Sequence, residues 1–322
     1  MDQKDAMQQW RDEVLAAGYS LTAGGELRIH ALINPNADIQ RAENAYRLLC
    51  ERVPDSRDAL EGLAFILQHR GAHTEGAQIR KRLVDLRVGE LGIPKPNQAQ
   101  ASEYLCAAEG LVEAPQRAPA SYVSDLFDRY AQTFETQLVA ELAYRVPELL
   151  FDAVMRSEDR IPQPVVALDA GCGTGLAGAL FHPRCERVDG VDLSAEMLAK
   201  ARERAIYSSL ERADLSELLA RRPSTYSLIV AADVFPYFGD LSDVFELSGR
   251  ALKPGGVLCF TVEQCSIDGY RLRNTGRYQH GESYVRRVLS ETGHTTIECQ
   301  SQQLRHNHGQ PVHGLVVVAT RP

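Results

Sequence analysis

The sequence predicts two domains of different class: an all-α region first, then an α/β domain with a mostly parallel sheet. Residues 1–115 carry apolar side chains at helical spacing and contain almost nothing that is typical of a strand. Beyond residue 115, short apolar runs alternate with helical segments, which is the pattern of parallel β-α-β units. One such run, VVALD (165–169), leads into the glycine-dense turn GCGTG (171–175), whose backbone is free to approach a ligand closely.

The N-terminal region shows a weak internal similarity when the sequence is shifted by 35 positions. Residues 55–86 predict two helices with a turn at Arg70-Gly71. This pair resembles the tetratricopeptide repeat, a helix hairpin with a period of about 34 residues. A second repeat over 36–54 keeps mainly its second helix, and helices at 4–17 and 98–112 would cap the array. A generic helical bundle is the alternative interpretation.

Composition excludes several classes of function. With 322 residues, 44% hydrophobic and 24% charged, the chain has the composition of an ordinary globular protein. Its formal net charge of −8 lacks the basic surplus of a nonspecific nucleic-acid binder. No apolar run approaches the ~20 residues of a membrane-spanning helix, and the charged N-terminal stretch predicts no signal peptide. We therefore expect a cytoplasmic protein that binds neither nucleic acid nor membrane, with its seven scattered cysteines reduced.

Two proline-containing stretches, 92–98 and 113–121, are the linker candidates. They predict a helical domain over 1–115, a linker with lid helices over 116–160, and an α/β domain over 161–322. Because the glycine turn lies in the last of these, the chemistry is expected there.

The glycine turn predicts a nucleoside-containing ligand. Gly171, Gly173 and Gly175 alternate at the end of an apolar strand, and the helix that follows favours polar or anionic groups at its N-terminus. The next predicted strand ends at Asp192, 19 residues after Gly173, where an acid accepts hydrogen bonds from ribose hydroxyls. The string G-T-G-L-A-G also satisfies the dinucleotide pattern GxGxxG, which is weak alone. These features leave two cofactor classes open.

The longer string Asp169-Ala-Gly-Cys-Gly-Thr-Gly resembles motif I of the class I S-adenosylmethionine-dependent methyltransferases. Four further blocks keep that family's order: GVDLSAEMLAKARER, ERADLSELL, YSLIVAADVFPYFGDL and LKPGGVLCFTVE. The resemblance implies a Rossmann-like, mostly parallel seven-stranded sheet, with an antiparallel last strand from the hairpin that TTIECQSQQLR and HGLVVVATRP would form.

The same resemblance implies S-adenosylmethionine as cofactor and S-adenosylhomocysteine as product. Asp169 would lie near the methionine end, Asp214 would reach the adenine amino group, and Leu215 would pack beside the adenine ring. The cofactor-binding residues that it implies in this domain are Asp169, Gly171, Cys172, Gly173, Gly175, Asp192, Leu193, Met197, Asp214, Leu215 and Ala232.

Upstream, LFDRYAQTFETQLV (126–139) resembles the segment before the catalytic domain in bacterial tetratricopeptide-repeat methyltransferases. An aromatic segment covers the cofactor in related enzymes, so the resemblance implies lid residues, with Tyr122 and Tyr130 contacting the cofactor: Tyr122, Phe127, Tyr130 and Phe134. The usual pattern has a histidine where this chain has Gln137. An amphipathic helix that merely packs its aromatic side chains is the alternative.

The stretch GYRLRNTGRYQHGESYVRR (269–287) indicates the methyl acceptor. Its arginines sit where the fold borders the substrate cleft, and arginine binds a carboxylate bidentately. A carboxylate has no proton to lose at neutral pH, so its O-methylation needs no base. We therefore expect a small carboxylic acid held by an arginine cluster, although Arg286 and Arg287 equally suit solvated or paired positions. The predicted substrate-binding residues are Arg271, Arg273, Arg277, Asp233 and Tyr237.

His280 and Tyr278 are the candidate bases if the acceptor is instead a hydroxyl or an amine, and each also suits a packing role. No metal site is predicted. The acids Asp233, Asp240 and Asp243 have no metal-ligand spacing, and the histidines of the terminal hairpin form only a weak set: His306, His308 and His313. Cys172 is expected to be a small packed residue rather than a nucleophile.

Two other functions stay open at this level. The helical domain could recruit a protein or natural-product acceptor for N- or O-methylation, or could serve self-association, because repeat arrays bind partners on a concave face. Alternatively, the chain could bind its cofactor without turnover and act as a scaffold.

Overall fold

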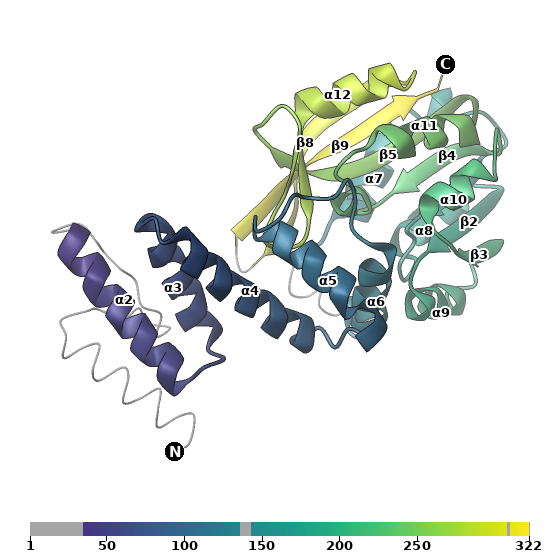
Figure 1. Ribbon diagram of the computed structural model, residues 1–322. Coiled ribbons are helices and arrows are strands. Elements are labelled where there is room, and N and C mark those ends of the chain that lie inside the picture. The colour runs from purple at the N-terminus through teal and green to yellow at the C-terminus, as the bar shows by residue number, and fades with distance from the viewer. Residues whose placement is uncertain (1–34, 136–142, 308–309, 322) are drawn as a thin grey trace. The chain divides into compact units, whose positions relative to one another are not determined.

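The structure, a computed structural model, describes three stretches of the chain: residues 35–135, 143–307 and 310–321. It divides the chain into two compact units: Met1–Gly92 with Glu109–Val112, and Ile93–Ala108 with Glu113–Pro322 (Figure 1). The predicted helix at 4–17 and Gln137 lie outside the described residues.

The described helices of the first unit form antiparallel neighbours in sequence order: α2 (Pro35–Arg52), α3 (Arg57–His69) and α4 (His73–Glu90). Ser56 caps α3 by accepting a hydrogen bond from the Ala59 N–H, and Gly71 turns the chain between α3 and α4 with φ of +77°. A Cβ at Gly62 would lie 2.3 Å from the Tyr46 ring, so this glycine lets α2 and α3 approach closely. The predicted helix pair over 55–86 is thus confirmed, whereas its membership of the tetratricopeptide family stays a prediction.

Helix α5 (Lys95–Ala108) belongs to the second unit, which differs from the predicted boundary at residue 115. Tyr104 explains the difference, because its hydroxyl donates to the Gly276 carbonyl at 2.9 Å and its ring lies 5.0 Å from that of Tyr122. Part of the predicted linker 92–98 is therefore helical. Pro96 is tolerated there because the first helical turn has no backbone acceptor for its missing N–H.

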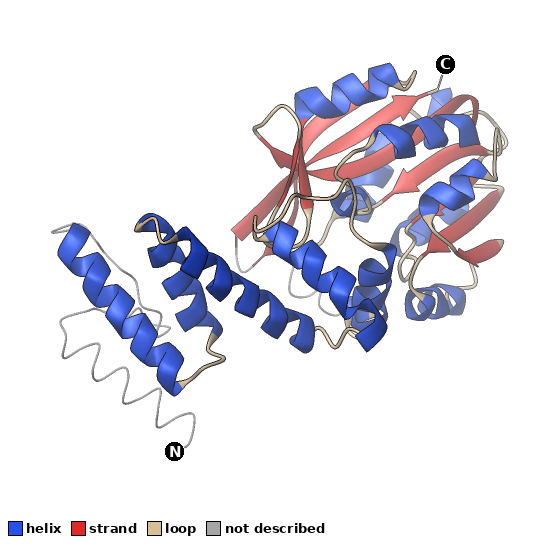
Figure 2. Ribbon diagram, in the orientation of Figure 1, coloured by secondary structure: helices blue, strands red, loops and turns tan. Residues whose placement is uncertain are grey.

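The second unit is built on a nine-stranded sheet in the described part of the chain (Figure 2). Its path runs β3-β2-β1-β4-β5-β7-β6, and β9 pairs with both β5 and β8. The strands are β1 (Val166–Ala170), β2 (Arg187–Asp192), β3 (Ser209–Arg212), β4 (Tyr226–Ala231), β5 (Leu252–Cys265), β6 (Tyr270–Leu272), β7 (Tyr278–Gly281), β8 (Thr295–Asn307) and β9 (Gln310–Thr320). β1 to β5 are parallel, and β9 runs antiparallel to β5 and β8, as predicted.

The predicted number of seven strands is wrong because the arginine-rich segment after β5 forms a hairpin. β6 and β7 pair antiparallel, with Tyr270 opposite His280 and Leu272 opposite Tyr278. Gly276, at φ of +78°, reverses the chain between them. The end of β5 then pairs with β7 in parallel, while its middle pairs with β9.

Helices cover both faces of the sheet, so the central strands are buried throughout. One face packs against α7 (Val146–Met155) and α8 (Leu176–Phe181). The other packs against α10 (Leu215–Ala220), α11 (Ser242–Ala251) and α12 (Glu282–Glu291). Ligands bind at the carboxyl ends of the strands in open α/β sheets, and the acids Asp169 and Asp192 lie at these ends of β1 and β2.

The remaining elements frame that edge: α6 (Ala120–Tyr130), α9 (Ala195–Glu203), and the short 3₁₀ turns η2 (Glu158–Arg160), η3 (His182–Arg184) and η4 (Phe235–Tyr237). Of the helices within the described ranges, none is long and apolar enough to cross a lipid bilayer.

Candidate active site

The glycine turn after β1 adopts a backbone that side chains rarely tolerate. Gly171, Gly173 and Gly175 have φ of +62°, +53° and +92°. A Cβ at Gly171 would also lie 2.6 Å from a methyl of Val234, so both conformation and space demand glycine there. Gly175 caps α8, whose first N–H groups therefore open toward this edge of the sheet. At these three positions the turn presents backbone rather than side chains to whatever binds above it.

Asp192 ends β2 beside this turn. Its Oδ2 accepts from the Gly173 N–H at 2.9 Å, and its Oδ1 accepts from the Ser194 N–H at 2.8 Å. The side chain is only partly buried, and each carboxylate oxygen has a second lone pair. Asp192 is thus held in one orientation with acceptor capacity to spare, as binding of ribose hydroxyls requires.

Asp169 ends β1 and is buried on the other side of the turn. Its Oδ2 accepts from the Gly178 N–H at 2.9 Å and from the Tyr207 hydroxyl at 2.6 Å. Its Oδ1 is buried with no hydrogen-bond partner among the described residues, and the same holds for the Thr174 hydroxyl. Burial raises the pKa of Asp169 to about 7, although the bonds from Tyr207 and Gly178 act to lower it.

These two orphaned atoms fit the amino-acid end of S-adenosylmethionine. Its ammonium would donate to Asp169, and its carboxylate would accept from the Thr174 hydroxyl. The turn therefore offers one hydrogen-bond acceptor and one donor that complement the ammonium and carboxylate groups of the predicted cofactor.

Three of the predicted cofactor residues have buried side chains. Cys172 is 6% exposed and packs with Leu198 and Ala201, Met197 is fully buried, and Leu215 is 7% exposed within the core under α10. Hydrophobic packing accounts for the burial of Cys172 and Leu215, and cofactor contacts from all three residues stay predictions. Burial also raises the pKa of the Cys172 thiol well above its usual range, which excludes a reactive thiolate.

Asp214 lies at the predicted adenine position, at the end of β3, but it already has partners. It caps α10 by accepting from the Ser216 N–H at 2.9 Å, and it forms an ion pair with Arg117. Leu193 contributes its carbonyl, which accepts from the Ser124 hydroxyl at 3.2 Å. Ala232 is half-buried next to Asp233 after β4.

Helix α6 is fastened to the loop that follows Asp192. Besides the bond from Ser124 to Leu193, Asp128 Oδ1 accepts from the Ser194 hydroxyl at 2.5 Å and from the Glu196 N–H at 3.2 Å. Tyr122 is buried against Tyr104, and Tyr130 is 37% exposed. The burial of Tyr122 places it behind the helix, which favours packing over the predicted cofactor contact.

An aromatic row leads from the glycine turn toward β4. A Cβ at Gly173 would lie 3.9 Å from the Phe134 ring, whose centroid is 6.0 Å from that of Phe127. Phe127 in turn lies 5.6 Å from Tyr237. Two of the predicted lid residues, Phe127 and Phe134, thereby border the site.

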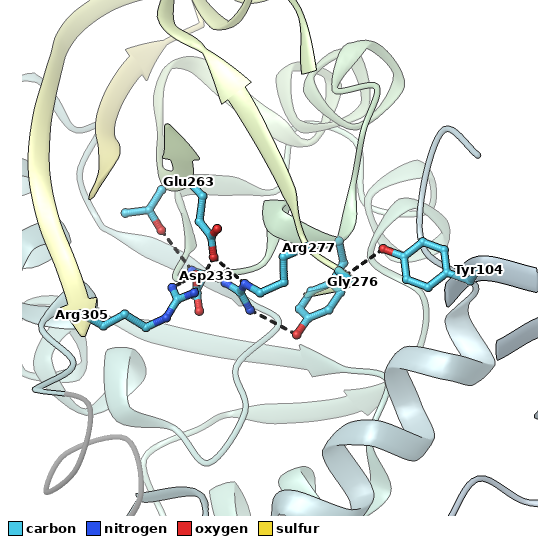
Figure 3. A network of polar contacts seen from close by, with 8 residues as sticks. Tyr104, Asp233, Glu263, Gly276, Arg277 and Arg305 are labelled. Carbon is cyan, nitrogen blue, oxygen red and sulfur yellow. Dashed lines mark hydrogen bonds and ion pairs between the residues drawn. The ribbon is translucent and has the colours of Figure 1, made fainter. Parts of the chain in front are cut away.

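A buried network of four charges lies at the far end of this row (Figure 3). Arg277 donates through Nε to Glu263 at 2.6 Å, through Nη2 to Asp233 at 2.6 Å and through Nη1 to the Tyr237 hydroxyl at 3.2 Å. Arg305, from β8, binds the same Glu263 oxygen and lies 3.6 Å from Asp233. The exposed fractions of these side chains are 16% or less, so the network is largely desolvated.

Two arginines and two carboxylates balance each other in this network. Burial alone would raise the pKa of Glu263, but the Arg277 and Arg305 guanidinium groups lower it to about 2. Burial opposes the charge on Arg277, yet Asp233 and Glu263 hold the pKa of Arg277 well above its ordinary range. Asp233 has φ of +63°, and its N–H donates to the Thr261 hydroxyl at 3.2 Å. Glu263 and Arg277 are therefore ionised at neutral pH, and their hydrogen bonds hold them in fixed positions.

The structure does not bring the predicted arginine cluster together. Arg271 and Arg273 are exposed on the β6–β7 hairpin, and Arg271 donates to Gln279. Arg286 pairs with Glu282, and Arg287 lies 3.7 Å from Glu291. Of the predicted arginines, only Arg277 points into the site.

The contacts of the two candidate bases argue against base catalysis. His280 is fully buried, its Nε2–H donates to the Gly239 carbonyl at 3.1 Å, and burial lowers its pKa to about 4. The Tyr278 hydroxyl donates to the Pro115 carbonyl, and burial raises its pKa above its ordinary value. Both side chains fasten the segment before α6 and the loop after η4 to β7.

His280→Gln should therefore leave turnover within about threefold of wild type, because glutamine keeps an N–H donor for the Gly239 carbonyl. Steady-state kinetics at neutral pH would measure this. A loss of more than a hundredfold in kcat, with the melting temperature unchanged, would restore His280 as a base.

Four residues of this region were not predicted as site residues: Tyr144, Tyr207, Glu263 and Arg305. Glu263 had a signal, since an acid inside the apolar strand VLCFTVEQC needs a buried partner. Tyr144 also faces the site, because the charges of Asp233, Arg305 and Arg277 all act on its buried phenol and its pKa lies well above the ordinary value. In the described part of the chain, no three His, Cys, Asp or Glu side chains are placed to bind a metal, and His308 lies outside that part.

Comparison with known proteins agrees with this geometry. A protein family described as a methyltransferase domain matches residues 167–256. Human methyltransferase-like protein 27 is 32% identical over 165 residues, which cover 48% of this chain and 61% of that protein. Trans-aconitate 2-methyltransferase of Pseudomonas paraeruginosa is 38% identical over 35% of this chain and 39% of its own length.

Two further proteins extend the comparison. Malonyl-[acyl-carrier protein] O-methyltransferase of Salmonella typhimurium is 34% identical over 30% of this chain and 38% of its own length. The solved structure of Burkholderia thailandensis 1,6-didemethyltoxoflavin-N1-methyltransferase, with S-adenosylhomocysteine bound, superposes with a TM-score of 0.50. It is 20% identical and covers 65% of this chain and 93% of that one, which shows a shared fold. This chain thus spans between about two fifths and three fifths of its curated relatives.

The fold, the glycine turn and the family match define one class. Residues 167–256 match a methyltransferase domain, and they lie within a Rossmann-like, mostly parallel sheet with antiparallel end strands. Domains of this class use S-adenosylmethionine, and the residues around Asp169 and Asp192 are suited to hold it.

Proposed function

We propose that this protein is an enzyme that methylates a carboxylate oxygen of a small organic acid, with S-adenosylmethionine as donor. The observation that carries the proposal is the buried pair Arg277 and Arg305 at the carboxyl ends of β4 and β5. When bound, S-adenosylmethionine supplies a methyl group on a sulfonium, which leaves as S-adenosylhomocysteine once the ester has formed.

A carboxylate acceptor suits the side chains at this edge. It needs positioning against the methyl group, but no proton has to be removed from it at neutral pH. His280 and Tyr278 both donate to backbone carbonyls and offer no base. The chain therefore has to bind and orient the acceptor and to exclude water. The aromatic row from Phe134 to Tyr237 supports the exclusion of water.

Arg277 and Arg305 have donors left for an acceptor carboxylate. A guanidinium has five N–H groups, and Arg277 uses three of its nitrogens on Glu263, Asp233 and Tyr237 with one bond each. Arg305 Nη1 is buried without a hydrogen-bond partner among the described residues. A carboxylate placed there would accept a hydrogen bond from this nitrogen.

Two of the curated relatives support the acceptor class. Their names give trans-aconitate and malonyl-[acyl-carrier protein] as the molecules they methylate, and both carry carboxylates. Which acid this chain takes, and whether its helical unit recruits a partner, stay predictions.

The proposal is tested with a panel of di- and tricarboxylic acids, trans-aconitate among them, assayed for S-adenosylhomocysteine release. Methyl esters of the same acids and a matched set of phenols and amines serve as controls. Turnover of free acids, with a methyl ester as product, supports the proposal. Turnover of a phenol or amine alone, or of none while the cofactor binds, would contradict it.

Arg305→Lys should raise the KM for the acid about tenfold and leave the affinity for S-adenosylhomocysteine unchanged. Lysine keeps the charge that Glu263 needs but loses the planar fork that binds a carboxylate. Arg271→Lys is the matched control, because Arg271 is exposed on β6 and should change neither constant. An unaltered KM in Arg305→Lys would remove this arginine from the acceptor site.

A further inference from the structure

Tyr207 lies behind the glycine turn, where no role was predicted for it. It comes from the segment between α9 and β3, and its hydroxyl donates to Asp169 Oδ2 at 2.6 Å. Two glycines on different elements make room for it. A Cβ at Gly178 would lie 2.2 Å from the Tyr207 oxygen, and a Cβ at Gly190 would lie 3.1 Å from its ring. The phenol therefore fills a slot formed by α8 and β2.

We propose that Tyr207 is a positioning residue that keeps the Asp169 carboxylate ionised and turned toward the glycine turn, and so sets the affinity for the cofactor's ammonium group. This inference rests on the proposed function, because it requires that S-adenosylmethionine binds at this turn.

Orientation follows from how the two oxygens of Asp169 are used. The Tyr207 hydroxyl and the Gly178 N–H both bind Oδ2, which leaves Oδ1 as the free acceptor. Rotation of the carboxylate would break two hydrogen bonds to a charged group at once. The unpartnered Oδ1 is therefore held in one orientation.

Charge follows from the groups that face Asp169. These groups are Tyr207, Asp192, Cys172 and Tyr144. Burial raises the pKa of both tyrosine hydroxyls and of the Cys172 thiol, so these three side chains stay neutral. Asp192 is therefore the one negative neighbour among the four. Burial and Asp192 raise the pKa of Asp169, while the Tyr207 and Gly178 bonds lower it, and the result is a pKa of about 7. Around neutral pH, the ionised fraction of Asp169 thus depends on the Tyr207 hydroxyl.

The test is Tyr207→Phe, with the dissociation constant of S-adenosylhomocysteine measured by calorimetry between about pH 6 and pH 8.5. Wild-type affinity should fall as the pH drops through about 7, because Asp169 takes up a proton. In the variant, this midpoint should rise by about one pH unit, and affinity at pH 7 should be about fivefold weaker. The ratio of the two constants at each pH cancels the titration of the ligand itself.

A second variant and a control complete the design. Gly178→Ala places a methyl 2.2 Å from the Tyr207 oxygen and 2.8 Å from Asp169 Oδ2, so it should disturb the hydrogen bond between them and give an upward shift although the hydroxyl is retained. Tyr226→Phe removes a hydroxyl from another buried tyrosine, at the start of β4, and should leave the profile unchanged.

The outcomes separate the two proposals. If wild-type protein binds no S-adenosylhomocysteine at any pH, the proposed function fails. If it binds and Tyr207→Phe shows the same constants and midpoint, the positioning role fails while the proposed function stands. An equal loss of affinity at every pH would show a packing role alone and would also overturn the inference.

Discussion

Asp192→Asn is expected to weaken S-adenosylhomocysteine binding about a hundredfold or more. The Gly173 and Ser194 N–H groups each point at one oxygen of this carboxylate. Asparagine has one acceptor oxygen, so its NH₂ group would face one of those donors. Each hydrogen bond to a charged group is worth about 1.5–3 kcal/mol, and 1.4 kcal/mol is a factor of ten in affinity. Calorimetric titration of both proteins measures the difference.

Asp189→Asn is the matched control for that experiment. Asp189 lies on the same strand and accepts from the Ser209 hydroxyl at 2.8 Å, away from the glycine turn. Its replacement should leave the dissociation constant within about twofold. Equal binding by Asp192→Asn and wild type would mean that the cofactor does not reach the end of β2.

Glu263→Gln is expected to lower the free energy of unfolding by about 3–5 kcal/mol, the range seen when one partner of a buried ion pair is removed. Glu263 is the shared partner of Arg277 and Arg305, and its side chain is 6% exposed. Without its charge, both guanidinium groups have to share Asp233. Urea unfolding at neutral pH measures the loss.

The same variant predicts a pH dependence. Because the folded-state pKa of Glu263 is lowered from 4.5 to about 2, its stabilising effect is complete above pH 4.5 and is lost as the pH falls toward 2. The gap between wild type and Glu263→Gln should therefore narrow in acid. Glu298→Gln is the control: its partner Arg156 is 52% exposed, so the loss should be at most about 1 kcal/mol. Similar effects of the two substitutions would contradict the account of the network.

The cofactor side of the site could be predicted because its signals are local in sequence. Gly171, Gly173 and Gly175 sit within five residues, and a backbone with positive φ at alternate positions has few other solutions. Asp192 could be predicted as the ribose-binding acid because its spacing of 19 residues from Gly173 is that of one β-α-β unit. Whether a side chain beside the turn faces a ligand or the core is a tertiary property, so the sequence could not show that Cys172 and Leu215 pack in hydrophobic clusters.

The acceptor side could be predicted only in part. Asp233, Glu263, Arg277 and Arg305 come from four separate segments, and nothing in their spacing shows that they meet. The polar run RLRNTGRYQ has few apolar residues and gives no strand period, yet pairing with β5 makes it a hairpin. That hairpin carries Arg277 inward and leaves Arg271 outside, a distinction that charge counting cannot make.

Ser194 serves three elements at once. Its N–H holds Asp192, its oxygen caps α9 by accepting from Met197, and its hydroxyl donates to Asp128 of α6. Helix α6, which borders the site, and Asp192, the acid predicted to bind ribose, are thus joined through Ser194 alone. A displacement of α6 that broke the bond between Ser194 and Asp128 would also disturb the bond from the Ser194 N–H to Asp192. Movement of α6 away from the site and weaker binding of the ribose would then occur together.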